Sequence, residues 1–168
     1  MEMNKLPFYD MSDNPTGCCP VFKPDTWEGV TLHFKDKPFV RAKTHSVLHV
    51  PVDMGKVFSR VFKHMEDSGV YEASDFVVMS RDLSSWKAEH LFAANKPVDA
   101  EEMTTLSGDF VTKVFEGGYR EAKNWYNEMQ ALAAEHGTKN AEVWFFYTTC
   151  PRCAKVYGKN YVVGLARL

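Results

Sequence analysis

Four cysteines are the residues whose types and spacing most clearly indicate chemistry. Cys18 and Cys19 are adjacent in the stretch PTGCCPVF, and Cys150 and Cys153 form a Cys-x-x-Cys motif near the C-terminus. Cysteine sulfurs act as nucleophiles, as redox groups and as ligands of zinc. The motif therefore indicates a redox dithiol, half of a metal site or a tight turn.

The position of the motif excludes a thioredoxin-like dithiol. That fold needs its motif at the start of a long helix after an early strand, with more strands and another helix to follow. Only residues 154–168 follow Cys153, and they predict one terminal strand. We therefore interpret TTCPRCAKVYGK (148–159) as a hairpin-like loop between the last two strands.

A Cys-x-x-Cys loop is a common half-site for zinc because its two sulfurs converge on one ion. The other two cysteines would complete it, so the candidate metal ligands are Cys18, Cys19, Cys150 and Cys153. Adjacent cysteines seldom both bind one tetrahedral ion, and a histidine could replace one of them. The histidines considered for this role are His33, His45, His49 and His90.

Two other interpretations of the cysteines stay open. One is a reversible disulfide or a reactive thiol, either within the motif or between the N-terminal stretch and the loop. The other is four reduced cysteines that only pack between these two segments.

Glu89 is the candidate for acid–base chemistry. Alternation in KAEHLFAAN (87–95) places Glu89 on the same face as Leu91 and Ala93. A carboxylate beside apolar side chains is partly desolvated, which suits it to general acid or base catalysis or to binding a cation. If that face meets solvent, Glu89 is an ordinary surface residue. His90 and His49 are more typical of satisfied core or surface histidines.

Aromatic residues are numerous, with 12 Phe, 7 Tyr and 4 Trp. Aromatic side chains suit flat apolar ligands, although most of them fill the core of a chain of this size. The candidate ligand contacts are Trp86, Tyr119, Trp125 and Tyr147. Trp125 lies on the apolar face of a predicted helix, which favours a core position.

The elements that would position these residues occur twice in the same order. The first half predicts a strand over 45–53, a helix over 55–69 and strands over 75–80 and 87–95. The second half predicts a strand over 107–117, a helix over 119–137 and strands over 141–149 and 159–168. Both helices end at a glycine. An internal duplication is the simplest explanation.

Two β-α-β-β units predict an α+β fold, in which an antiparallel sheet carries both main helices on one side. We expect one domain over residues 1–168, with repeats at 44–99 and 100–168. Residues 1–43 hold most of the eight prolines and predict an irregular N-terminal extension. The other side of the sheet, or the seam between the repeats, would be free to hold a ligand.

The composition is that of an ordinary globular domain, with 45% hydrophobic and 25% charged residues. A net charge of −2 without a basic stripe argues against nucleic-acid binding. The apolar runs are shorter than a membrane span and the N-terminal stretch is polar, so we expect a cytoplasmic protein without membrane contact. Cytoplasmic thiols stay reduced, which favours free, metal-bound or reactive cysteines.

The second half, LSGDFVTKVFEGGYREAKNWYNEMQALAAEHG (106–137) with a following strand, loop and closing strand, resembles the GyrI-like domain superfamily. Its members carry a strand ending in a Gly-x-Tyr-type turn, a helix with a central Trp and a hairpin. The duplicated order extends this resemblance over about residues 44–168. The stretches CCPVF and TTCPRCAKVYGKNYVV also look like a bacterial subgroup whose members are often labelled hydrolase.

The resemblance implies small-molecule binding in a cleft between the repeats, and hydrolysis of reactive compounds by some stand-alone members. The superfamily usually has a ligand-facing Glu two residues before a Tyr on the strand after the second helix. Tyr147 is present here, but Phe145 occupies the position of that Glu. Glu89 and Glu142 are the available substitutes.

We therefore predict a protein that binds a small apolar or aromatic molecule in an aromatic-lined cleft between the repeats, as a monomer or homodimer. The first alternative is a hydrolase of a reactive small molecule, in which Glu89 activates water beside Tyr147 or Trp86. The second alternative is a metal- or thiol-based sensor module, with zinc as its cofactor.

Overall fold

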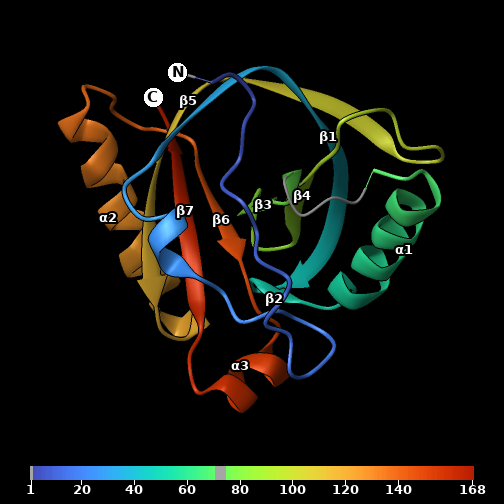
Figure 1. Cartoon of the computed structure of the whole chain (residues 1–168). Helices are drawn as coiled ribbons and strands as arrows, with labels where there is room; N and C mark the ends of the chain where they lie inside the picture. Colours follow the sequence, from blue (N-terminus) through green and yellow to red (C-terminus); the bar gives the residue numbers. More distant parts are fainter. Residues whose placement is uncertain (1, 71–74) are drawn as a thin grey trace.

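The computed structural model describes residues 2–70 and 75–168 of the chain. Its strands are β1 (Thr31–Val47), β2 (Val50–Pro51), β3 (Val78–Asp82), β4 (Lys87–Ala93), β5 (Glu102–Glu116), β6 (Val143–Tyr147) and β7 (Tyr161–Arg167). Its α-helices are α1 (Met54–Asp67), α2 (Ala122–Glu135) and α3 (Pro151–Tyr157), and single 3-10 turns lie at Pro24–Thr26 and Tyr119–Glu121. The predicted α+β class with an antiparallel sheet is confirmed (Figure 1).

The strands form one antiparallel sheet in the order β2-β1-β4-β3-β6-β7-β5. The two halves of the chain thus contribute β1-β4-β3 and β5-β7-β6, which is the same internal order and agrees with a duplication. They meet at β3 and β6, where Ser80 pairs with Phe145. A second pairing between β1 and β5 closes the sheet into a barrel-like fold.

Closure gives the sheet an inner and an outer face. Side chains on the inner face build one core cluster that includes Phe39, Leu91, Phe110 and Trp144. The outer face carries α1 over one half and α2 over the other, each with its own apolar cluster. Both helices therefore lie on one side of the sheet, as predicted, and Figure 1 shows them flanking it.

Residues 2–30, which precede β1 and are called the N-terminal segment below, fill the inner face of the sheet. Its residues Leu6, Tyr9, Phe22 and Trp27 are all buried and belong to the inner core cluster. Figure 1 shows this segment, in dark blue, crossing the sheet on its way to α3. The face expected to be free for a ligand is therefore occupied by the chain itself.

Regular structure begins earlier than expected. β1 starts at Thr31, inside the segment predicted to be irregular, and the strand predicted over 45–53 consists of the end of β1 and the short β2. The register of β1 against β5 shifts between Phe34 and Lys37, where Asp36 adopts a positive φ of 49°. This bulge interrupts the alternation of apolar residues and hides a long strand from the sequence pattern.

The prediction of a loop over residues 148–159 is wrong, because these residues contain α3. Pro151 occupies the first turn, where its missing N–H costs nothing, and Gly158 ends the helix with a φ of 73°. Both residues are ordinary helix boundary signals that the cysteine motif obscured. The Cys-x-x-Cys motif consequently spans the start of a short helix, as it does in thioredoxins, but within an antiparallel sheet.

Among the helices that the structure describes, none has the length and hydropathy that a membrane span needs.

Candidate functional site

The four cysteines form one cluster at α3. Their Sγ atoms all lie within 4.8 Å of one another, although Cys18 and Cys19 come from the N-terminal segment and Cys150 and Cys153 from the start of α3. Cys153 is buried, Cys18 is exposed, and no disulfide joins them. The fold therefore gathers the four residues predicted as metal ligands.

Polar contacts hold the N-terminal segment against α3. Thr16 Oγ1 lies 3.2 Å from Cys153 Sγ and 2.9 Å from the hydroxyl oxygen of Tyr157. That hydroxyl donates to the backbone oxygen of Cys19 at 2.6 Å, and the Cys150 N–H donates to Cys19 Sγ at 3.4 Å. The sulfurs of Cys153 and Cys19 are thus each held by a polar contact with the opposite segment.

The spacing of the sulfurs fits a tetrahedral zinc ion. A zinc–sulfur distance of about 2.3 Å places the sulfurs of a regular tetrahedron about 3.8 Å apart. The Sγ atoms of Cys18 and Cys19 are 3.8 Å apart, so the adjacent cysteines are compatible with one ion. Four protein ligands fill the coordination of zinc and leave no position for substrate, which is typical of a structural site.

The thiols of the cluster differ in their tendency to ionise. A hydrogen bond with Thr16, aided by the neighbouring thiols, lowers the pKa of Cys153 to about 6. Burial raises the pKa of Cys19 above its ordinary value. Metal ligation requires thiolates, so a metal ion that binds here releases protons from the remaining thiols.

The histidines considered as alternative ligands are engaged elsewhere. His33 Nδ1 pairs with Asp109 at 2.7 Å, His45 Nδ1 with Asp53 at 2.9 Å, and His49 Nδ1 with Asp82 at 2.7 Å.

His90 is a satisfied core histidine. Its ring nitrogens lie 2.8 Å from Thr44 Oγ1 and 2.7 Å from Ser80 Oγ, and Phe58 packs edge-on against the ring. Burial lowers the pKa of His90 to about 4. It is therefore a neutral residue of the core between the sheet and α1.

Glu89 lies on the inner face with Leu91 and is buried. Arg41 donates to Glu89 Oε2 from Nε at 2.8 Å and from Nη2 at 2.5 Å, and Arg81 Nε lies 3.4 Å from Oε1. The Arg81 guanidinium also stacks 4.1 Å from the ring centre of Trp144. Arg41 thus holds one carboxylate oxygen by hydrogen bonds and Arg81 lies at ion-pair distance from the other, so Glu89 is a buried carboxylate between two partly exposed arginines.

The four aromatic candidates do not form one cleft lining. Trp125 is buried under α2 between Phe115 and Phe145, with ring centres 5.6 and 6.4 Å away. Trp86 is exposed on the turn between β3 and β4.

Tyr119 and Tyr147 are the two aromatic candidates that meet, at a ring distance of 6.0 Å, and both are partly exposed. Burial raises the pKa of the Tyr147 hydroxyl. Tyr147 follows Phe145 on the outer face of β6, whereas Glu89 is on the inner face of β4. The expected pairing of Glu89 with Tyr147 around one water is therefore not formed.

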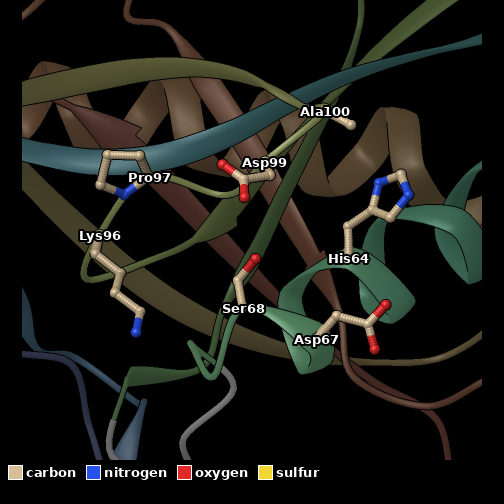
Figure 2. A pocket seen from close by; sticks show the side chains of 7 residues that line it. All are labelled: His64, Asp67, Ser68, Lys96, Pro97, Asp99 and Ala100. Atoms are coloured by element: carbon tan, nitrogen blue, oxygen red, sulfur yellow. The ribbon is translucent and has the colours of Figure 1, made fainter.

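A polar pocket of about 450 Å³ lies at the end of α1 and was not anticipated (Figure 2). His64 and Asp67 line it from α1, Ser68 from the residue after this helix, and Lys96 and Asp99 from the connection between β4 and β5. Figure 2 shows these two groups on opposite sides of the hollow. The pocket combines a histidine with cationic, anionic and hydroxyl groups.

His64 belongs to a cluster of paired charges beside this pocket. Its Nδ1 lies 2.9 Å from Oε1 of Glu101, whose side chain is only 3% exposed. Arg60, one turn earlier on α1, donates to both oxygens of Glu101 at 2.9 and 3.2 Å. Burial opposes the ionisation of Glu101, but the hydrogen bonds from Arg60 and His64 outweigh it and lower its pKa.

Sequence reasoning missed this arrangement because its parts are far apart in the chain. Arg60 and His64 share one helix face four residues apart, which is a local signal. Their partner Glu101 follows 37 residues after His64. Only the packing of α1 beside the connection to β5 brings the three together.

The chain matches the family described as bacterial hydrolase over residues 9–168, and it belongs to that family. This range includes the cysteine cluster and the polar pocket at the end of α1. No curated protein matches the chain.

Proposed function

We propose that this chain is a cytoplasmic hydrolase of small molecules whose N-terminal segment is fastened to the fold by a structural zinc ion. The zinc assignment rests on the distances between the four cysteine Sγ atoms, which all lie within 4.8 Å of one another. An all-sulfur ligand set favours zinc over harder ions such as magnesium or calcium. The ion would be held by Cys18, Cys19, Cys150 and Cys153.

Zinc at this position would stabilise the fold rather than take part in the reaction. Cys18 and Cys19 lie between Tyr9 and Phe22, which belong to the inner core of the sheet. Because this site does not exist in the unfolded chain, the free energy of zinc binding to these cysteines and those of α3 would add to the free energy of folding. The zinc supplies a crosslink, and the chemistry is left to other residues.

The hydrolase assignment is supported by membership of the bacterial hydrolase family. The pocket at the end of α1 supports a small-molecule substrate, because about 450 Å³ lies within the range of about 300–1,000 Å³ usual for such sites. Its polar lining favours a polar substrate over the apolar or aromatic one expected from the sequence. We further propose that the chain is related to the GyrI-like superfamily and that it is a monomer or a homodimer.

Cobalt substitution tests the two parts separately. The protein is refolded or expressed with Co²⁺ and assayed against carboxylic esters, lactones, amides and phosphoesters beside the zinc form. We expect the absorption bands of tetrahedral cobalt thiolate and a kcat within about twofold of the zinc form, because a four-ligand site touches no substrate. Absence of these bands contradicts the zinc site. A tenfold change in kcat places the metal in the reaction, and no turnover on any class contradicts the hydrolase.

A further inference from the structure

We propose that His64 is the general base of this chain, acting in the polar pocket at the end of α1 on small polar carboxylic esters or lactones. This inference rests on the proposed hydrolase and names its site and its substrate class. It is independent of the cysteine cluster, since none of the cysteines lines this pocket.

The tautomer of His64 follows from its partner. The Glu101 carboxylate accepts two hydrogen bonds from Arg60 and so stays ionised, which makes it an acceptor for the Nδ1 proton of His64 at 2.9 Å. A neutral imidazole with its proton on Nδ1 carries its lone pair on Nε2. Nε2 is therefore the atom available to a water molecule in the pocket.

Glu101 supplies both orientation and charge to this base. A buried carboxylate behind an imidazole fixes the plane of the ring and stabilises the imidazolium that forms when the ring takes a proton. Arg60 keeps Glu101 in place and ionised, and it is itself half exposed. Glu101 and Arg60 are positioning residues, because they act through His64.

His64 combines this support with access to the cavity. Its side chain is 31% exposed and lines the pocket together with Lys96. Lys96 lies on the opposite side of the pocket from His64, where its ammonium group is suited to an anionic or carbonyl group of the substrate (Figure 2). Asp67, on the same wall, is already paired with Lys63 at 3.2 Å.

The reaction proceeds without any oxidant or cofactor. A water oxygen bonds to the ester carbonyl carbon while its proton passes to Nε2 of His64. The carbonyl electron pair moves to the oxygen and gives a tetrahedral intermediate. When this pair returns, the bond between the carbon and the alkoxy oxygen breaks, and His64 gives its proton to the departing alcohol.

The test uses p-nitrophenyl acetate and δ-valerolactone as probes, with free imidazole as the reference for unassisted catalysis. H64Q removes the base, and H136Q removes an exposed histidine just after α2 as the matched control. We expect kcat/KM to fall by about 100-fold or more in H64Q and to stay unchanged in H136Q. Thermal unfolding and zinc content show that both variants keep the fold.

Two further variants test whether a loss of activity in H64Q could come from a change in structure. E101Q should lower kcat with little change in KM, because the ring loses the charged partner that orients it. K96M changes an exposed side chain on the opposite side of the pocket, so it should keep the stability of the wild type and raise KM more than it lowers kcat.

The outcomes distinguish this inference from the proposed function. An H64Q protein that hydrolyses the probes as fast as the wild type overturns the role of His64 and leaves the hydrolase standing. A wild-type rate no higher than that of imidazole on both probes overturns the ester class and His64 together, while turnover of amides or phosphoesters would preserve the hydrolase alone.

Discussion

Thr16 Oγ1 lies 3.2 Å from Cys153 Sγ, although 137 residues separate them in the chain. The contact joins the N-terminal segment to the helix that follows the sixth strand. The segment also places Tyr9 and Trp27 in the core inside the closed sheet. The cysteine cluster therefore lies where a crosslink would control whether this segment stays in place.

Loss of one cysteine should release the metal and destabilise the protein. In C153S we expect less than stoichiometric zinc and a free energy of unfolding reduced by at least about 2 kcal/mol, because zinc binding contributes directly to folding. Chemical denaturation measures this change. A chelator should lower the unfolding temperature of the wild type and leave that of C153S unchanged, and an equal response in both proteins would contradict the account.

Stability should depend on pH through His90. Its pKa is about 4 in the folded protein against 6.5 for an ordinary histidine, so the unfolded state binds the extra proton between these values. Stability is then complete above pH 6.5 and falls as the pH drops toward 4, by about 3 kcal/mol in total. Denaturation curves at several pH values should show this slope in the wild type and in H136Q, and a smaller one in H90Q.

Breaking the charge network on the inner face should cost more than breaking a surface pair. E89Q leaves Arg41 and Arg81 without their buried counter-charge, and we expect a loss of about 1–3 kcal/mol, since both arginines are partly solvated. E128Q removes the partner of Lys113 on the surface and should cost less than about 0.5 kcal/mol. Equal costs for the two substitutions would show that Glu89 is not held as described.

Gly164 leaves room on β7 for the side chain of Met129 from α2. A Cβ at this position would lie 2.6 Å from Met129 Sδ and 3.0 Å from Phe115 Cε2, and Met129 is fully buried. G164A should therefore lower the free energy of unfolding by about 1–3 kcal/mol. In the control G55A the new methyl group meets nothing within 4 Å, and helix propensity should make it neutral or stabilising by about 0.5 kcal/mol. A stabilising G164A would contradict the packing.

Local patterns predicted much of this fold. Alternation along β4 placed Glu89 with Leu91 on one face and His90 on the other, and the structure agrees. The apolar faces of α1 and α2 followed from spacings of three and four residues. The presence of four cysteines, together with the preference of zinc for sulfur ligands, predicted that residues at opposite ends of the chain form one cluster, and the structure brings them together.

What the sequence concealed depends on long-range packing. Nothing local shows that Tyr9 and Trp27 fill the inside of a sheet, or that β1 pairs with β5 to close it. The register of β3 against β6, in which Ser80 pairs with Phe145, decides that Glu89 and Tyr147 face opposite ways. The pairing of His64 with Glu101 needs the packed position of α1, so no sequence window contains it.

Elemental analysis of untagged protein, purified without added metal and combined with a free-thiol count, decides whether the four cysteines hold zinc. We expect about one zinc ion per chain, with the thiols of the native protein protected from titration until it is unfolded or treated with a chelator. A metal-free protein with four freely titratable thiols would contradict the zinc site, because the cluster would then be a packing contact between Cys18, Cys19, Cys150 and Cys153.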